Sequence, residues 1–376
     1  MPVLAFLVAA AYVPGIFSAA SMPRWWVIAI GLPLVSKLDP WSLTPAVRWI
    51  WLSGLVWAFA MLFISRHPLE GSLDFFFLLL MFGVAVAASE RDDLGPVMTG
   101  FVIGLGLSSI LVVVQFFGWS PVPQTASPAG LFFNREILAE VAAPLLVWSV
   151  LNRKLGQALI CTIPVALCDS RIAVLVTVLC IGYAWLPKNW WARFSVAGLT
   201  ALASGAGLFM LGAGKIGSAG LRMVLWGTAV LSITPMGHGL GYWRDAHPFP
   251  IEEFVHSDAL QLLVELGCLG AVFFVIPAIV LWRGQHNIAE RAAFIAICLE
   301  AVVSFPLHGA AGAFIFAALA GFMARDRAPV HDPGLPRGIA FGQCVRWQET
   351  YAAGLDRAGQ RVGASLPLRP SHRSDA

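Results

Sequence analysis

Long apolar segments separated by short polar stretches recur along the first 324 residues of the chain. Segments of roughly 15–23 apolar residues are long enough to cross a bilayer as helices. They fall at residues 2–20, 23–36, 46–64, 71–89, 95–117, 136–151, 156–168, 172–187, 192–212, 259–282, 292–308 and 309–324. The pattern predicts an all-α polytopic membrane protein of about twelve spans, of which the second, the seventh and the last are short.

The composition supports a polytopic protein over a soluble domain with one anchor. Only 12% of the residues are charged and 58% are hydrophobic, whereas soluble domains carry about 25% charged residues. The six cysteines show neither a C-x-x-C motif nor a His/Cys spacing suited to zinc. The absence of a P-loop and of a dinucleotide-binding glycine motif disfavours an ATP-driven pump and a Rossmann domain. We expect no cofactor, no bound metal and no nucleic-acid partner.

Basic residues are distributed unevenly between alternate loops. With a cytoplasmic N-terminus, seventeen of the 24 lysines and arginines fall in inner loops or in the C-terminal tail, which satisfies the positive-inside rule and places both termini in the cytoplasm. The seven outer ones are Arg24, Arg66, Arg135, Arg171, Lys215, Arg222 and Arg244. Because positive charge on the outer face opposes the topology signal, we expect an anionic ligand there.

The same pattern divides the chain into two parts. We expect one transmembrane domain over residues 1–324, with its working face in the outer loop 213–258. Within that loop, residues 221–233 predict a short amphipathic helix in which Arg222 and Trp226 share a face. The tail 325–376 is rich in Arg, Pro and Gly without a sustained apolar period. We expect it to be disordered and cytoplasmic, lying against anionic membrane lipids.

His256 stands where the polar outer loop meets the next apolar helix. Ser257 is predicted to cap that helix, and Asp258 lies in its first turn, where the helix dipole favours a carboxylate. Asp258, Gln261 and Glu265 then recur at helical spacing. A histidine at a hydrated helix start with carboxylates nearby can act as a general base. The alternative is an interfacial histidine that caps a turn.

Small and polar residues near this junction add to the pattern. Gly267 and Gly270 allow a neighbouring helix to approach closely. Polar side chains that fall inside apolar segments are expensive in a bilayer and mark functional candidates or hydrogen bonds between helices. This set comprises Asp74, Gln115, Glu140, Glu265 and Glu300.

Three of the outer arginines begin or flank apolar segments: Arg135, Arg171 and Arg222. The guanidinium group makes two-pronged, weakly hydrated contacts with phosphate. The alternative for each is snorkelling toward lipid headgroups, and Asp169 is close enough in sequence to pair with Arg171. Three arginines at one level of the membrane favour a phosphate ligand.

These elements together resemble the O-antigen ligase and polymerase superfamily. His256-Ser257, followed by nine residues and Gly267-x-x-Gly270, is similar to that family's H-[NSQ]-x9-G-x-x-G pattern. Leu221–Trp226 and the glycines at 237, 239 and 241 resemble its R-x-x-x-W element and its glycine-rich approach to the histidine. Ser170-Arg171 and Phe132–Leu138 resemble two further elements. The resemblance covers about residues 130–325.

The resemblance implies a metal-independent glycosyltransferase at the outer face of a bacterial inner membrane. The donor would be a glycan on undecaprenyl diphosphate, and the acceptor a glycan or lipid A–core. His256 would be the base for the acceptor hydroxyl. Arg171 and Arg222 would bind the diphosphate. Arg135 is a further candidate for this role, although the family usually has a residue other than arginine at that position. Ser257, Asp258, Glu265, Gly239, Gly241, Gly267 and Gly270 would support the site.

Several functions remain open at this point. An O-antigen ligase is the leading interpretation, and a polymerase or a protein O-oligosaccharyltransferase would use the same chemistry on another acceptor. A transporter or flippase of a lipid-linked anionic solute is the alternative from a different class. It predicts inverted repeats and charges deep in the spans, and the sequence shows no repeat. A structural membrane partner would leave the outer arginines unexplained.

Overall fold

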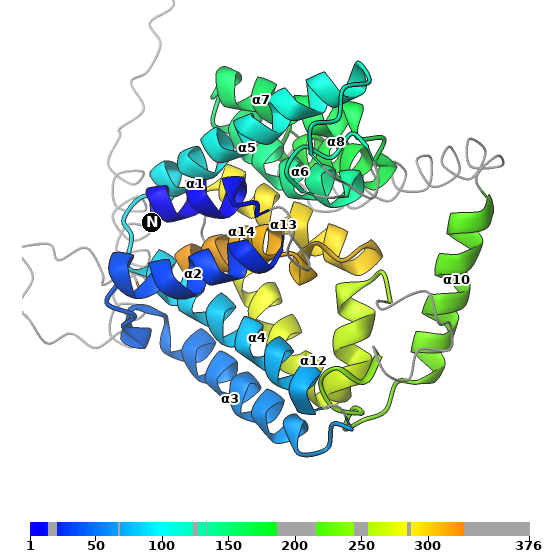
Figure 1. The fold of residues 1–376 in the computed structure, drawn as a ribbon. Coiled ribbons are helices and arrows are strands. Elements are labelled where there is room, and N and C mark those ends of the chain that lie inside the picture. The colour runs from blue at the N-terminus through cyan, green and yellow to red at the C-terminus, as the bar shows by residue number, and fades with distance from the viewer. Residues whose placement is uncertain are drawn as a thin grey trace, which may run out of the picture. The chain divides into compact units, whose positions relative to one another are not determined.

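A computed structural model of the chain describes residues 1–13, 21–66, 68–122, 127–132, 134–185, 216–243, 255–283 and 287–326, with only the backbone at 216–219 and 221. Within these ranges the chain is helical and forms no β-strand. The α-helices are α1 (Pro2–Ala10), α2 (Met22–Val35), α3 (Pro45–Leu62), α4 (Pro68–Ser89), α5 (Gly95–Phe116), α6 (Arg135–Leu151), α7 (Leu155–Leu167), α8 (Arg171–Trp185), α10 (Ile216–Leu231), α12 (Asp258–Arg283), α13 (Ile288–Val303) and α14 (Ala310–Met323). Figure 1 labels these α-helices. Two short 3-10 helices complete the described part: η1 (Pro40–Ser42) lies between α2 and α3, and η3 (Pro306–His308) lies between α13 and α14.

The predicted all-α class is confirmed for the described residues. Most predicted apolar segments end within a few residues of the end of an observed helix. In that part of the chain, four helices are long and apolar enough to cross a membrane: α3, α4, α5 and α12. The shorter apolar helices leave the predicted number of twelve spans open. The predicted span 192–212 and the tail from 327 onward lie outside the described residues.

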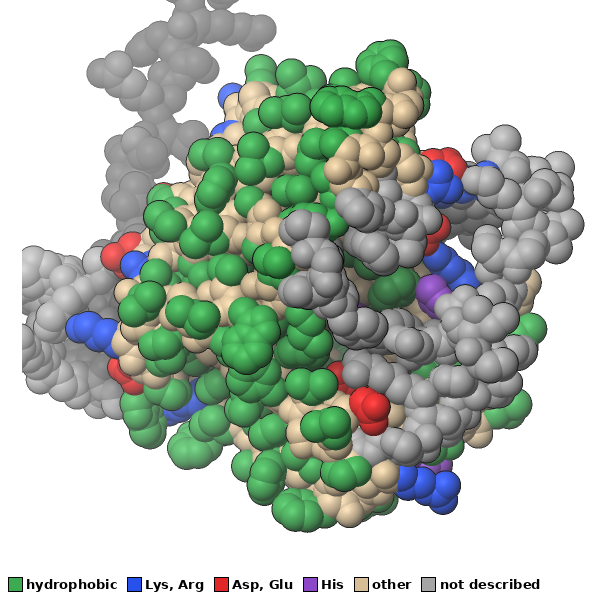
Figure 2. Space-filling view, viewed as in Figure 1, with side chains coloured by type: hydrophobic (Ala, Val, Ile, Leu, Met, Phe, Trp, Pro, Cys, Tyr) green, Lys and Arg blue, Asp and Glu red, His purple; other side chains and the backbone are tan. Residues whose placement is uncertain are grey.

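Large apolar side chains cover much of the helix surface. Leu34 is 80% exposed, Phe117 81% and Leu155 78%, and Figure 2 shows hydrophobic side chains over most of the visible face. Such a surface would be an aggregation hazard in water but is favourable against lipid tails. Together with the four long helices it indicates a membrane protein.

The interior is built from small and apolar residues on tightly packed helices. α4 packs chiefly against α14, α1 against α5, and α6 against α7 and α13. At Gly321 of α14 an added Cβ would lie 1.9 Å from the carbonyl oxygen of Ala85. Small residues at helix crossings allow this approach, which van der Waals packing then stabilises within a bilayer.

The loops that the charge pattern assigns to one side do meet at one end of the helices. Ser36 donates to Glu90 over 2.9 Å, and Arg325 donates to the carbonyl of Arg91 over 2.7 Å. Loops assigned to the other side also meet one another. Arg24 donates to the carbonyl of Leu131 over 3.1 Å, and Arg222 pairs with Glu136 at 2.7 Å. Their grouping fits the predicted alternation of helices, while the direction across the membrane stays a prediction.

That direction can be tested with single cysteines in a variant lacking the native ones. Gly227 on α10 and Gly156 on α7 both have open space where a side chain would begin. A membrane-impermeant maleimide should label Gly227→Cys in intact spheroplasts and should reach Gly156→Cys only after permeabilisation. The reverse pattern would place the loop 213–258 in the cytoplasm.

Candidate functional site

The start of α12 carries the predicted cap. The hydroxyl of Ser257 accepts a hydrogen bond from the backbone N–H of Leu260 at 3.2 Å, so it satisfies one of the amides that a helix start leaves without a partner. The same hydroxyl donates to the carbonyl of Val302 at 2.7 Å. Ser257 therefore both begins α12 and ties it to the end of α13.

Asp258 extends this connection to the turn that follows α13. Its backbone N–H donates to the carbonyl of Ser304 at 3.0 Å. One carboxylate oxygen accepts from the N–H of Leu307 at 2.8 Å, and the other is hydrogen-bonded to Nδ1 of His308. Both oxygens of Asp258 are thus engaged, which fixes the carboxylate and the His308 ring against each other.

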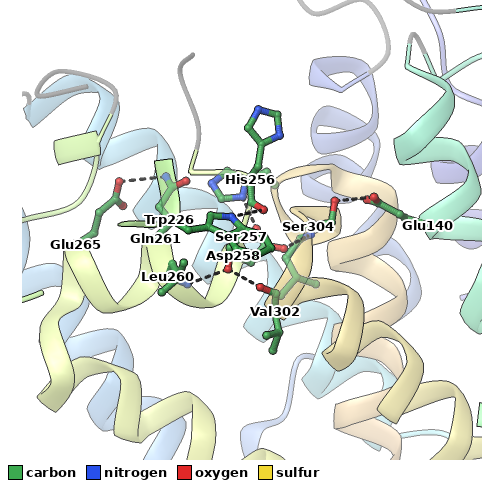
Figure 3. Close-up of polar contacts among 12 residues, drawn as sticks. Glu140, Trp226, His256, Ser257, Asp258, Leu260, Gln261, Glu265, Val302 and Ser304 are labelled. Carbon is green, nitrogen blue, oxygen red and sulfur yellow. Dashed lines mark hydrogen bonds and ion pairs between the residues drawn. The ribbon is translucent and has the colours of Figure 1, made fainter. Parts of the chain in front are cut away.

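His256 is held by its backbone and by an aromatic contact. Its φ of 56° lies in the left-handed region, which costs a non-glycine residue about 1–2 kcal/mol. The indole N–H of Trp226 donates to the His256 carbonyl at 3.4 Å, and the His256 ring lies edge-on to Phe305 with centroids 4.7 Å apart. In Figure 3 the imidazole points away from the chain of hydrogen bonds that joins Ser257, Asp258 and Ser304.

A break in α12 receives the glycine-rich loop. At Gly267 the backbone leaves the helical conformation, with φ 75° and ψ 176°. The carbonyls of Val264 and Glu265 accept from the N–H groups of His238 and Gly239, both at 3.0 Å. On the other side of the break, Cys268 and Leu269 donate to Thr234 and Pro235 at 3.2 Å. The loop thus replaces hydrogen bonds that the broken helix loses, as a bilayer requires.

The predicted role of the glycines is partly wrong. Gly270 does meet a neighbouring helix, because Trp57 of α3 donates to the carbonyl of Leu266 at 2.9 Å beside it. Gly267 instead contacts the loop, where an added Cβ would lie 2.3 Å from the nitrogen of Gly237. Gly239 and Gly241, with φ of 99° and 78°, face the end of α3 and the start of α4 rather than the histidine.

Of the three candidate arginines, Arg135 and Arg171 begin α6 and α8, and Arg222 lies in the second turn of α10. Arg222 pairs with Glu136 at 2.7 Å, and Arg135 lies 3.7 Å from Asp169. The expected pairing of Asp169 with Arg171 is therefore replaced by one with Arg135. In the part of the chain that the structure describes, no ion pair is found for Arg171.

A buried hydrogen bond joins the arginine side to the α12 side. Glu140 lies one turn below Glu136 on α6 and accepts from the hydroxyl of Ser304 at 2.5 Å. The carbonyl of Ser304 in turn accepts from Asp258, so α6, α12 and α13 meet at one residue. Figure 3 shows His256 and Asp258 between Glu140 on one side and Glu265 on the other.

A cavity of about 1590 Å³ runs beside α12. Most of its walls are apolar, but Asp258, Gln261 and Glu265 line it along the polar stripe of α12 predicted from the sequence. His308 lines it as well. Among the described residues that form this lining, His256 and the three candidate arginines are absent. The cavity therefore reaches the site at Asp258 and His308.

His308 is the main residue that the sequence analysis missed. Burial lowers the pKa of its imidazole, but the carboxylate of Asp258, with Asp74 and Glu265 nearby, outweighs this effect and raises the pKa above its usual value. The available signal was a histidine near Pro306, at the end of the otherwise apolar predicted segment 292–308. Glu136, the partner of Arg222, was also missed.

The arrangement has the groups that transfer of a glycosyl group from a diphosphate to a hydroxyl needs. It offers a histidine for the hydroxyl proton and arginines for the phosphate charge. Among the described residues, no three His, Cys, Asp or Glu side chains cluster as metal ligands would, and independence from metals stays a prediction. The roles assigned to His256, Arg135, Arg171 and Arg222 are likewise predictions.

In comparisons with known proteins, no protein-family model matches the chain and no curated protein shows significant similarity to it. The family resemblance thus rests on the quoted motifs alone.

Proposed function

We propose that the protein is a glycosyltransferase that moves a glycan from a polyprenyl diphosphate to an acceptor hydroxyl at the outer face of a bacterial inner membrane. An O-antigen ligase with lipid A–core as acceptor is the leading form of this proposal. The observation that carries it is the convergence of His256 with the start of α6 and the middle of α10, through Trp226 and the Arg222–Glu136 pair.

The chemistry divides between two kinds of side chain. His256 takes the proton of the acceptor hydroxyl as its oxygen bonds to the anomeric carbon of the donor sugar. The bond from that carbon to the diphosphate breaks, and its electron pair leaves with the diphosphate. Arginines stabilise this developing charge. Deprotonating one hydroxyl and neutralising one leaving group is a task that these side chains can perform without a metal ion.

The Arg222–Glu136 ion pair is partly exposed to solvent, which suits a site where an anionic ligand replaces the carboxylate. The Arg222 side chain is 21% exposed and that of Glu136 is 42% exposed. Pairs with this much solvent contact contribute only about 0–1 kcal/mol. A diphosphate can therefore replace Glu136 as the partner of Arg222 at little cost.

Substitution of the arginines should affect the donor. Arg222→Ala and Arg171→Ala should weaken donor binding and turnover together, because a guanidinium contacts phosphate in both the ground and the transition state. Lysine should restore the charge but not the two-pronged geometry, so it should rescue only in part. Donor affinity and single-turnover rates of the purified variants test this. An unchanged donor affinity in both alanine variants would remove the arginines from the site.

The glycan profile of a deletion strain separates the versions of the function. Unligated lipid-linked polymer indicates a ligase, and glycans limited to single repeats indicate a polymerase. Loss of glycan from proteins alone indicates a protein O-oligosaccharyltransferase. Lipid-linked glycan that accumulates on the cytoplasmic side would favour the flippase alternative, and an unchanged profile would contradict the whole class.

A further inference from the structure

At one end, the cavity beside α12 is lined by a group of carboxylate, amide and imidazole side chains, and Ser21, Tyr183 and Arg283 line other parts of it. The group comes from three elements: Glu70 and Asp74 from α4, Asp258, Gln261 and Glu265 from α12, and His308 from η3. The rest of the lining is largely apolar. A molecule with a polar head and an apolar remainder fits such a cavity.

His308 is oriented before any ligand arrives. Asp258 is hydrogen-bonded to Nδ1 of its ring and is itself anchored by the N–H of Leu307. Nδ1 of His308 is thereby committed to Asp258. Rings fixed by a carboxylate in this way lose little entropy on binding.

Gln261 and Glu265 form a second oriented pair. Both side chains are 4% exposed, and the Gln261 amide donates to Glu265 at 3.1 Å. The same carboxylate oxygen accepts from the N–H of Trp243 at 3.4 Å. A buried pair held this firmly discriminates strongly for a ligand whose hydroxyl groups complete its hydrogen bonds, since a ligand without them leaves polar groups unsatisfied.

The negative charge at the polar end of the cavity disfavours binding of a phosphate there. Four carboxylates line the cavity, from Glu70, Asp74, Asp258 and Glu265, and at that end His308 is the cationic partner among the described lining residues. Carboxylates accept hydrogen bonds and repel anions. A diphosphate is thus directed to the arginines near α6, α8 and α10, and uncharged hydroxyl groups are directed to the cavity.

We propose that the polar end of the cavity binds an uncharged sugar of the acceptor, with His308 and the Gln261–Glu265 pair hydrogen-bonding its hydroxyl groups. This inference rests on the proposed function. His308 is here a binding residue, and His256 keeps the proton transfer.

The kinetic test compares two variants with a control. His308→Asn and Gln261→Ala should each raise the KM for the acceptor about 10-fold or more, because each removes a hydrogen bond within a charged network. The kcat and the KM for the donor should change less than about 2-fold. Gln261→Ala leaves the Asp258–His308 contact intact, so it covers the case in which His308→Asn fails to fold. Thr228→Ala, on the exposed side of α10, is the control. A raised KM for the donor, or an unchanged KM for the acceptor, would overturn the proposal.

A binding test separates this inference from the proposed function. The melting temperature of the purified full-length protein should rise with butyl β-glucoside and not with butyl phosphate, because a ligand that binds the folded state stabilises it. His308→Asn and Gln261→Ala should lose this shift. An equal or larger shift with butyl phosphate, or a shift retained in both variants, would contradict the sugar site. A glucoside shift in a protein without transferase activity would instead contradict the proposed function alone.

Discussion

Replacing His256 should abolish glycan transfer while leaving the donor bound. Loss of a general base typically costs about 10²–10⁴ in rate, and the base acts on the acceptor hydroxyl rather than on the diphosphate. His256→Ala should therefore show this loss in single-turnover transfer, with donor affinity within about 2-fold of wild type. Quenched-flow transfer and a separate donor-binding assay on the purified variant provide the measurement.

The backbone at His256 calls for a second variant. Its φ of 56° is tolerated better by Asn than by Ala, so His256→Asn should keep the local conformation without supplying a base. Both variants should melt near the wild-type temperature. Near-wild-type turnover in His256→Asn would return the histidine to the role of a capping residue.

Substitution of Gly267 should have the largest effect on folding. The backbone there occupies a region that is accessible essentially to glycine alone, at a cost of about 1–3 kcal/mol for other residues. An alanine Cβ would also lie 2.3–2.5 Å from backbone atoms of Pro235, Met236 and Gly237. Gly267→Ala should therefore lose at least about 3 kcal/mol of stability or fail to accumulate.

A helical glycine in open surroundings provides the control. Gly227 on α10 has no atom within 4 Å of an added Cβ, and alanine favours a helix by about 1 kcal/mol over glycine. Gly227→Ala should match or slightly exceed the wild type in thermal melts of the purified protein. Equal melting temperatures for Gly267→Ala and wild type would show that the loop does not seat in the break of α12.

Local signals in the sequence predicted much of the fold. Most apolar runs gave helix ends within a few residues, because the length of such a run and its polar borders are local properties; the predicted segment 2–20 is an exception, since α1 ends at Ala10. The Ser257 cap and the shared face of Arg222 and Trp226 followed from helix geometry. The polar stripe from Asp258 to Glu265 was also predicted, and it lines the cavity.

Contacts between distant segments were harder to predict. Arg24 was counted as an outer cation, but it is only 3% exposed. Its guanidinium carbon lies 3.8 Å from the centroid of the Phe132 ring, and the group donates to the carbonyls of Ala9 and Leu131. Gly267 contacts a loop thirty residues upstream rather than a helix. The Asp258–His308 pair joins residues fifty positions apart. No spacing rule links such residues, because helix packing alone brings them together.

Transfer from a polyprenyl diphosphate is tested most directly with the purified protein in lipid vesicles. The vesicles would carry undecaprenyl diphosphate bearing a radiolabelled glycan, with lipid A–core, a second lipid-linked repeat or an acceptor protein added in turn. We expect the label to move to one of these acceptors, with one undecaprenyl diphosphate released for each glycan transferred. Label that stays on the lipid with all three acceptors, in a protein shown to be folded and to bind the donor, would contradict the account.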